Sequence, residues 1–422
     1  MLFVDVPMYE LIIIGGGAAG MFAAVNAAAM GVKVLLLERN KRLGAKLLLT
    51  GKGRCNLTNN CSVNELLENT PTGRRFLYSA YNRFSPSDTM DFFTELGVTL
   101  TTERGGRVFP SSMRSSDIVL ALEKKLKALG VTQSQGRAKA ITKKDNGLLV
   151  TLFSGESFSA QTVLLATGGK SYPKTGSSGD GYIIAEKLGH NITSLKASLV
   201  PLVTKGDDCR KMQGLSLKNV GIKVINRSKK VLFEDFGELL FTHYGISGPL
   251  ALSASAHMKD FEKNEYSVIL DLKPGLDESK LDARILRDFE KSKNRSFSNT
   301  IADLHSKSMI PVLINRTEIP PFTKVHSISR EQRKSLVRVL KEFQLDILEP
   351  RPIEEAVITS GGVDLREINP KTMESKLING LFFAGEVIDA DAYTGGFNLQ
   401  IAWSTSFVAA KAVANKLGEA TT

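Results

Sequence analysis

A short apolar run at residues 11–14 and a mostly apolar run at 32–37, which contains Lys33, flank an alanine-rich segment that extends from residue 18 to residue 30. An unbroken run of leucine and isoleucine predicts a strand buried on both faces of a parallel sheet, and the segment between the runs has the length of a helix. Gly15, Gly17 and Gly20 occupy a GxGxxG spacing where the first run gives way to this segment. The order of strand, glycine turn, helix and strand predicts the first βαβ unit of a Rossmann-type domain.

The spacing of apolar residues then predicts helices and short strands that complete this part of the domain. Helices are expected at residues 74–83, 85–97, 117–129 and 181–188, the second of them begun by Ser85 and ended by Gly97. Alternating runs at residues 138–142, 148–152 and 157–159 predict a small β-meander, and the run at 162–166 returns to the parallel sheet.

The pattern changes after residue 193, where short strand-like runs replace the alternation of strands and helices. A β-rich insert is expected at residues 194–275 and a helical insert at 276–349, before strand character returns at 355–359 and a last helix follows at 401–417. The predicted fold class is α/β, a doubly wound Rossmann-type domain that is discontinuous. Its two parts are expected at residues 1–193 and 350–422.

The glycine turn gives the first indication of chemistry, because backbone N–H groups at a helix start attract a pyrophosphate. Glu38 ends the second strand about twenty residues beyond the glycines, where a Rossmann domain places the carboxylate that accepts ribose hydrogen bonds. Two later strands also end at glycine, in TVLLATGG at residues 162–169 and GLFFAGE at 380–386. The second can bring Gly385 and Glu386 to the ribityl-pyrophosphate part of a flavin, so FAD is the expected dinucleotide.

The remainder of the chain indicates how such a flavin would be reduced. No second strand-GxGxxG-helix unit occurs, so NADH or NADPH is expected to dock transiently at the flavin itself. Residues 393–398 precede the last helix, where their amides could point at the flavin pyrimidine, on which negative charge develops during reduction. Thr359, Ser360, Gly361 and Gly362 are further candidates, because a glycine pair after a strand brings the backbone close to a ligand.

Composition excludes several other classes of protein. The chain has 422 residues, of which 42% are hydrophobic, enough for two or three domains with cores. Its apolar stretches are far shorter than the roughly 20 residues of a membrane-spanning helix, and residues 1–9 carry Asp5 and no basic cluster, so neither a membrane span nor a signal peptide is expected. Three cysteines without metal-ligand spacing predict neither a disulfide framework nor a structural metal. A cytoplasmic protein is expected.

The net charge of +11 is suited to a polyanionic partner, although a basic but merely solvated surface has the same charge. Many of the cations fall in the segment around the expected flavin site, so a positive entrance to that site is expected. They are Arg39, Lys41, Arg42, Lys46, Lys52, Arg54, Arg74, Arg75, Arg83, Arg104, Arg107 and Arg114.

Five long motifs give the sequence a resemblance to a known family. They are KLLLTGKGRCNLTN at residues 46–59, GKSYPKTGSSGDGY at 169–182, GELLFTHYGISGPL at 237–250, RPIEEAVITSGGVDLREINPKTMESK at 351–376 and AYTGGFNLQIAWSTS at 392–406. With these the chain resembles the BaiN/RdsA family of FAD-dependent oxidoreductases, the aminoacetone-oxidase-like flavoproteins. The resemblance implies an FAD-binding domain interrupted by a β-barrel-like plus helical insert. It also implies reduction of carbon–carbon double bonds or oxidation of amines.

The glycine turn, the strand ends and the motifs together give a set of expected cofactor-binding residues. They are Gly15, Gly17, Ala18, Ala19, Gly20, Glu38, Arg39, Lys46, Thr50, Gly51, Gly53, Arg54, Cys55, Asn56, Thr167, Gly168, Gly169, Gly385, Glu386, Gly395, Gly396, Phe397, Asn398 and Leu399. No metal ligands are expected.

Cys55 and His243 are the candidate catalytic residues. Reduction of an enone or a uracil needs a hydride at one carbon and a proton at its neighbour, and a thiol beside Arg54 could supply that proton. The alternatives are that Cys55 fills space under the flavin, or that it pairs with Cys61 as a redox disulfide. His243 could hold substrate or donate a proton, or it could bond to backbone and shape its loop.

The expected function is FAD-dependent reduction of a conjugated C=C bond by NAD(P)H, with uridine in large-subunit ribosomal RNA as the favoured acceptor. The positive charge favours RNA, which gains affinity from every phosphate neutralised. Two other classes stay open: a small-molecule enone reductase or amine oxidase, and a flavin-bearing RNA-binding protein without turnover. The oligomeric state is not predicted.

Overall fold

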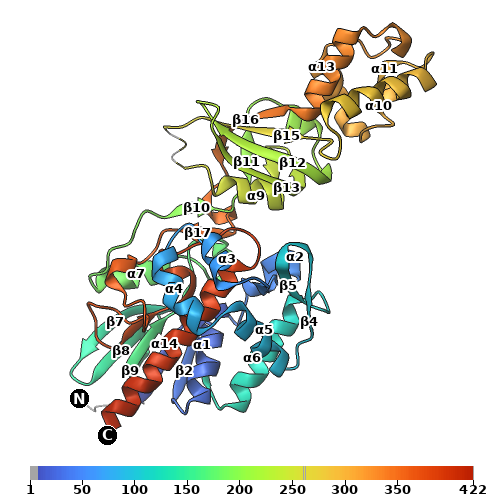
Figure 1. The fold of residues 1–422 in the computed structure, drawn as a ribbon. Helices are drawn as coiled ribbons and strands as arrows, with labels where there is room; N and C mark the ends of the chain where they lie inside the picture. Colours follow the sequence, from blue (N-terminus) through green and yellow to red (C-terminus); the bar gives the residue numbers. More distant parts are fainter. Residues whose placement is uncertain (1–7, 260, 262, 422) are drawn as a thin grey trace. The chain divides into compact units, whose positions relative to one another are not determined.

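The computed structural model describes residues 8–259, 261 and 263–421, with side chains up to residue 419. It separates into two compact units, one formed by Met1–Ala197 with Val357–Thr422 and the other by Ser198–Ala356 (Figure 1). The segment with Asp5, in which no signal peptide is expected, lies outside the described residues. No helix in the described part of the chain is long and apolar enough to cross a membrane.

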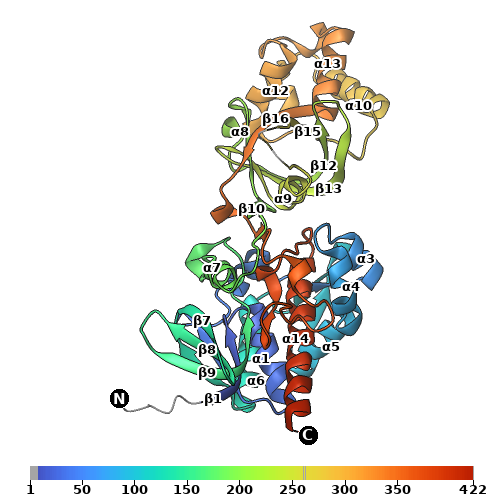
Figure 2. The same cartoon turned by 90° about the vertical axis from the view of Figure 1, so that its left-hand side faces the viewer.

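A seven-stranded sheet forms the centre of the first unit, in the order β6-β2-β1-β9-β8-β7 with β18 also paired to β9. The strands β6, β2, β1, β9 and β18 run parallel, whereas β7 and β8 join β9 as an antiparallel meander (Figure 2). Their bounds are β1 Met8–Ile14, β2 Val34–Glu38, β6 Thr132–Gln135, β7 Ala138–Lys144, β8 Gly147–Leu152, β9 Ser157–Leu165 and β18 Leu381–Phe383.

The unbroken apolar runs of β1 and β2 follow from burial on both faces of this sheet. Leu11 and Ile13 contribute to a core on one face, and Ile12 and Ile14 contribute to a core on the other, all four being buried. Alternating polar residues would leave one of these cores without its side chains, so the pattern at residues 11–14 records a doubly covered parallel strand.

Helices pack on this sheet and around the candidate site. They are α1 Ala18–Ala29, α3 Val63–Glu68, α4 Arg74–Arg83, α5 Pro86–Glu95, α6 Ser115–Ala128, α7 Asp180–Lys187 and α14 Phe397–Thr421. The predicted start of α5 at Ser85 is confirmed. The Ser85 side chain accepts a hydrogen bond from Asp88 N, and the Asp88 carboxylate accepts one from Ser85 N.

The long helix α14 lies alongside α1 and is fixed there by an aromatic cluster (Figure 1). Trp403 is fully buried, its ring lies 5.2 Å from that of Phe22, and its Nε1 donates to Leu57 O at 2.9 Å. A buried indole needs such an acceptor, so Trp403 is a core residue rather than an exposed platform.

The second unit is built around a closed antiparallel barrel in the order β11-β14-β13-β12-β15-β16. Its strands are β11 Leu202–Thr204, β12 Ser216–Asn226, β13 Val231–Phe241, β14 Gly245–Ser247, β15 Tyr266–Asp271 and β16 Phe343–Pro350. The helices α10 Glu278–Lys291, α11 Phe297–Ile301, α12 Ile310–Thr317 and α13 Arg330–Lys341 form a helical part between β15 and β16. The expected insert is therefore a barrel that carries a helical part in one of its connections.

Strand β16 was not predicted, although its sequence carries the signal. Phe343, Leu345 and Ile347 are buried while the residues between them are exposed, which is the alternation of a half-buried strand. The expected helical insert at residues 276–349 included this strand, because the apolar spacing of α13 continues directly into that of β16. The helical part consequently returns to the barrel through its closing strand.

We predict that Trp403→Phe lowers the free energy of unfolding of the first unit by about 1–3 kcal/mol, because Leu57 O loses its buried donor. Urea denaturation followed by circular dichroism measures the change. Leu120→Ala, on the exposed face of α6, is the control and should stay within about 0.5 kcal/mol of wild type. A Trp403→Phe protein as stable as wild type would remove Trp403 from the interactions that fix α14.

Candidate functional site

The candidate site lies at the carboxyl ends of four adjacent parallel strands of the first unit. The glycine turn follows β1, Glu38 ends β2, Thr167 to Gly169 follow β9, and Gly385 follows β18. Carboxyl ends of parallel strands meet at one edge of a sheet, which is where doubly wound folds bind their ligands. The topology therefore brings together segments that lie far apart in the sequence.

The glycine turn combines close packing with open space. Gly15 has a φ of +108°, and a Cβ at Gly20 would lie 1.7 Å from Gly15 O, so only glycine lets α1 approach β1 this closely. Gly17 is different, since its φ is −82° and a Cβ there would meet no atom within 4 Å. The first and third glycines thus shape the turn, and the second leaves room above the start of α1.

Glu38 holds this turn with both carboxylate oxygens. Oε2 accepts from Gly16 N at 2.7 Å and Oε1 accepts from Asn40 N at 2.8 Å. Each oxygen keeps a lone pair, so the predicted hydrogen bonds from a ribose remain available to it. Removing the carboxylate would also free two backbone donors, which gives Glu38 a structural role that the sequence did not indicate.

A charged cluster surrounds Glu386 at the end of β18. Glu386 accepts from Lys46 Nζ at 2.7 Å, from Ser171 Oγ at 3.2 Å and from Thr359 N at 2.8 Å. Lys46 also donates to Ser171 Oγ at 2.6 Å. The ammonium balances the carboxylate, so Glu386 can lie beside an anionic ligand without adding uncompensated negative charge. Ser171 was absent from the predicted residues and was marked only by its position in a long motif, whereas Thr359 was a candidate because it precedes the glycine pair Gly361 and Gly362.

Residues 50–56 form a tight loop with an uncommon backbone. Gly51, Lys52, Gly53 and Cys55 all have φ values between +58° and +83°. A run of left-handed residues turns successive N–H groups toward one side of the chain, which suits an electron-rich ligand. For Lys52 and Cys55 this conformation is strained, and their surroundings must hold it in place.

This loop and the two residues Thr58 and Asn59 after it contact the glycines before α14. Asn59 Nδ2 donates to Gly395 O at 3.0 Å, and Asn56 Oδ1 accepts from Gly396 N at 3.0 Å. A Cβ at Gly396 would lie 2.3 Å from Thr58 O, so a glycine is needed for the contact. Asn398 bonds Ala392 through both its amide atoms and therefore shapes the segment before α14.

Of three further residues of the predicted set, two have hydrogen-bond partners and one has a buried hydroxyl without a partner in the described part of the chain. Gly385 N donates to Thr405 Oγ1 at 3.0 Å, so this amide fixes β18 to α14. Arg39 donates to Asp180 at 3.1 Å, close to the start of α7. Thr167 Oγ1 is buried and finds no partner among the described residues, which fits a hydrogen-bonding group contributed by a ligand.

The cations around this site do not all contribute to a positive entrance. Arg39 pairs with Asp180, Lys46 with Glu386, and Arg54 with Glu103 at 3.0 Å, while Arg54 also stacks on Phe109. Carboxylates distant in sequence neutralise these cations, and a count along the chain does not reveal them. The expected positive entrance is correspondingly weaker.

Cys55 lies in the apolar core of the first unit, fully buried. Burial raises the pKa of its thiol to about 12, partly offset by a hydrogen bond with Thr50, so the thiol keeps its proton at neutral pH. Cys55, Cys61 and Cys209 are all free thiols.

His243 is exposed and belongs to the second unit, in the turn from β13 to β14, where its ring lies 4.9 Å from that of Tyr244. The catalytic assignments of Cys55 and His243 stay predictions.

The residues at the strand ends fit FAD. Open space above Gly17 at the start of α1 suits a pyrophosphate, and Glu38 has lone pairs for a ribose. The left-handed loop and the glycines before α14 offer backbone groups to a flavin ring. Thr167, with an unsatisfied buried hydroxyl, is consistent with a polar ligand nearby.

Comparison with known proteins agrees with this geometry. A family model described as the HI0933-like protein Rossmann domain matches residues 9–412. The 3-dehydro-bile acid Δ(4,6)-reductase of Clostridium scindens is 31% identical, over 97% of this chain and 100% of that one. The ribosomal RNA dihydrouridine synthase of Escherichia coli is 30% identical, over 96% and 97% of the two chains.

The solved 3-ketosteroid-Δ4-(5α)-dehydrogenase from Rhodococcus jostii RHA1 shares the fold, with a TM-score of 0.51, 15% identity, and coverage of 96% of this chain and 97% of that one. The predicted Rossmann-type α/β fold is confirmed, including the antiparallel barrel insert. The predicted enzyme class, an FAD-dependent oxidoreductase, is confirmed at the level of the family.

We predict that Gly17→Val leaves the protein folded and lowers its affinity for FAD at least about tenfold, or ~1.4 kcal/mol. The isopropyl group would occupy space that is open in the protein and suited to the pyrophosphate. Absorbance at 450 nm after gel filtration measures bound FAD, and a thermal melt of the cofactor-free protein tests the fold.

Gly275→Val is the matched control, because a Cβ there also meets nothing within 4 Å but lies in the second unit. It should keep its FAD. Gly20→Val is unsuitable for this purpose, since its clash with Gly15 O would unfold the turn itself. Full FAD content in Gly17→Val would show that the pyrophosphate does not bind at this turn.

Proposed function

Because the chain belongs to the HI0933-like Rossmann domain family, we propose that it uses FAD to pass hydride from NADH or NADPH to a conjugated C=C bond. The favoured acceptor is uridine in large-subunit ribosomal RNA, which would become dihydrouridine in the cytoplasm. The single observation that carries the use of FAD is the strand-end site with its open position for a pyrophosphate at Gly17. The two relatives described above are both named for the reduction of a double bond.

The residues of the first unit would divide the binding of FAD among them. The amides at the start of α1 would hold the pyrophosphate, Glu38 the ribose, and the loop at residues 50–56 the flavin ring. Bound FAD would supply the chemistry of accepting and releasing a hydride. The Lys46–Glu386 pair has no net charge, so Glu386 would add no uncompensated repulsion to the anionic cofactor.

Reduction of a uracil adds a hydride to one carbon of the C5=C6 bond and a proton to the other. Cys55 is the proposed proton donor, because its thiol is protonated at neutral pH and belongs to the loop that would hold the flavin. A thiol with a pKa near 12 is a weak acid, so it would protonate only a strongly basic carbon such as that of an enolate. His243 is the alternative donor or substrate contact.

An exposed basic surface on α4 supports RNA as the acceptor. Arg74, Arg75, Arg83 and Lys371 form no ion pair among the described residues, and Arg83 Nη1 donates to Lys371 O at 2.7 Å, which places these two together. Tyr78 lies on the exposed side of the same helix, 58% accessible. Arginines beside an exposed aromatic ring suit phosphates and unstacked bases.

This α4 surface begins close to the candidate site. A Cβ at Gly73, the residue before α4, would lie 2.9 Å from Ala390 Cβ, and Tyr393 N donates to Asn69 O at 3.0 Å. The segment at residues 390–393 leads directly to the glycines before α14. A polyanion held on α4 would thus extend toward the residues proposed to bind the flavin.

A small-molecule enone reductase is the second candidate, favoured by the 31% identity to the bile acid reductase.

Purified FAD-loaded protein with NADPH and large-subunit ribosomal RNA tests the proposal that the acceptor is RNA. We expect NADPH oxidation that depends on RNA and dihydrouridine in the product. An amine oxidase would instead release peroxide from an amine without RNA, and an RNA-binding protein without turnover would leave NADPH unconsumed.

We predict that Cys55→Ser leaves reduction of the flavin by NAD(P)H unchanged but slows transfer to the acceptor roughly 100-fold, because only the second half-reaction needs the proton. Stopped-flow absorbance at 450 nm measures the two half-reactions separately. Cys209→Ser is the control, a buried thiol of the second unit whose pKa is raised to about 11. Equal slowing of both half-reactions would assign Cys55 to packing.

We predict that Arg74→Glu combined with Arg75→Glu weakens RNA binding and reduces the slope of log affinity against log salt by about 1.4, roughly 0.7 for each phosphate that is no longer neutralised. FAD content should not change. Filter binding over a salt series measures the slope, and Lys124→Glu with Lys127→Glu, two exposed lysines of α6, is the control. A slope equal to that of wild type would show that α4 does not bind the RNA.

A further inference from the structure

We propose that the helical part of the second unit, residues 278–341, anchors RNA, with Phe322 stacking on an unpaired base and neighbouring lysines neutralising phosphates. The inference rests on the proposed function, because it names a second part of the chain that would hold the RNA substrate. An excess of positive charge, a pair of hydrogen-bonded segments and one exposed ring support it.

Most of the excess charge of the chain lies in this helical part. Its 64 residues carry 14 Lys and Arg and 7 Asp and Glu, a net charge of +7 out of +11 for the whole chain. Eight of these cations are exposed and form no ion pair among the described residues: Arg287, Lys291, Lys293, Lys307, Lys324, Arg330, Lys334 and Arg338. A surface that was basic only by chance would spread its excess over the chain more evenly, so this part is suited to a polyanion.

Two segments of the helical part lie antiparallel and are joined by hydrogen bonds. Phe297 N donates to Thr323 O at 2.8 Å, and Val325 N donates to Arg295 O at 3.2 Å. Lys324 Nζ reaches across to Asn294 O at 2.8 Å. These bonds bring the lysines of residues 291–293 next to residues 320–326 and hold both segments in one defined arrangement.

Phe322 projects from this arrangement with 84% of its surface exposed, more than any other large apolar side chain among the described residues. Two prolines precede it, Pro320 and Pro321, and they restrict the backbone that presents the ring. Exposure of a phenylalanine ring to water does not stabilise the protein. A ring whose backbone is already ordered can, however, stack on a base without loss of backbone entropy.

RNA fits this surface better than a protein or a membrane does. A protein interface needs a cluster of apolar residues at its centre, and Leu286, 41% exposed, is the only other exposed large apolar side chain among the described residues 278–341. A lone phenylalanine likewise contributes little to insertion into a bilayer. Single-stranded RNA offers both phosphates for the lysines and a π-face for the ring.

Full-length FAD-loaded protein is tested by filter binding with a transcript of large-subunit ribosomal RNA and with a fully duplex RNA of equal length. Phe322→Ala should lower the affinity for the ribosomal RNA transcript about tenfold and leave the affinity for the duplex RNA unchanged, because only unpaired bases can stack on the ring. Phe322→Trp should restore binding. Lys291→Glu with Lys293→Glu should weaken both complexes and reduce the salt slope by about 1.4.

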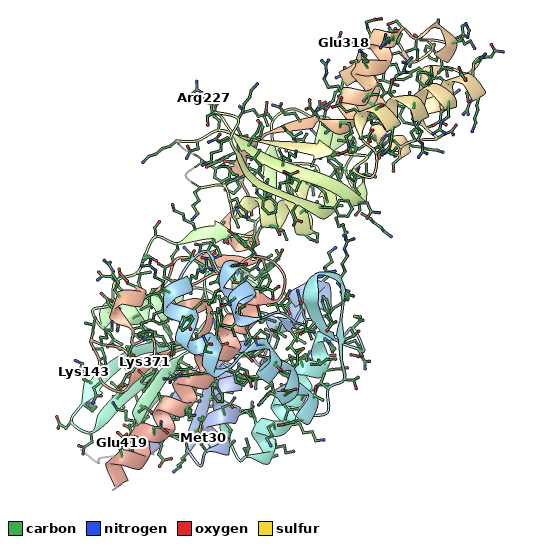
Figure 3. The ribbon with its side chains drawn as sticks, viewed as in Figure 1. Met30, Lys143, Arg227, Glu318, Lys371 and Glu419 are labelled. Carbon is green, nitrogen blue, oxygen red and sulfur yellow. The ribbon has the colours of Figure 1, made fainter. Side chains whose placement is uncertain are left out.

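Lys143→Glu with Lys144→Glu is the charge-matched control, at the β7–β8 hairpin of the first unit, where Figure 3 labels Lys143; the same view labels Glu318 in the helical part. Thermal melts should match wild type for all variants, since Phe322 and the lysines are exposed. If wild type binds RNA and every variant of the helical part binds equally well, the inference is wrong and the proposed function stands. If wild type does not bind RNA, both fail together.

Discussion

The close approach of α1 to the carboxyl end of β1 is the contact on which the candidate site depends. Gly20 permits it, because any Cβ there would lie 1.7 Å from Gly15 O. Once the helix starts this close to the sheet, its first amides face the open space above Gly17, and Glu38 can bond Gly16 N across the turn. The strand ends of β9 and β18 then complete the same edge. Close packing between the backbones of α1 and β1 therefore creates the position for the ligand.

Electrostatic balance decides where a polyanion can bind. Near the strand ends, Lys46, Arg39 and Arg54 are paired with carboxylates, so these residues hold the loops of the site together. Cations without an ion pair among the described residues include those of α4 and of the helical part of the second unit, and each of these surfaces carries one exposed aromatic ring. Net charge alone could not distinguish these roles, because a paired and an unpaired arginine count equally in a sequence.

Features set by local sequence could be predicted, and features set by distant contacts could not. The βαβ unit, the cap of α5 at Ser85 and the glycine strand ends follow from residues close together, and they were found. Strand β16 was missed because the apolar spacing of α13 runs into it without a break. The Lys46–Glu386 pair joins residues 340 positions apart, and the contact of Asn56 with Gly396 depends on the folded loop. Sequence spacing has no signal for such pairs.

The proposal that the acceptor is a uridine of large-subunit ribosomal RNA can be tested in cells. Dihydrouridine is mapped by mass spectrometry in ribosomal RNA from a strain that lacks the gene. We expect at least one dihydrouridine of the large subunit to disappear in that strain and to return with the wild-type gene, but not with the gene for Gly17→Val. An unchanged dihydrouridine pattern in the deletion strain would contradict the proposal and assign the protein to small-molecule reduction.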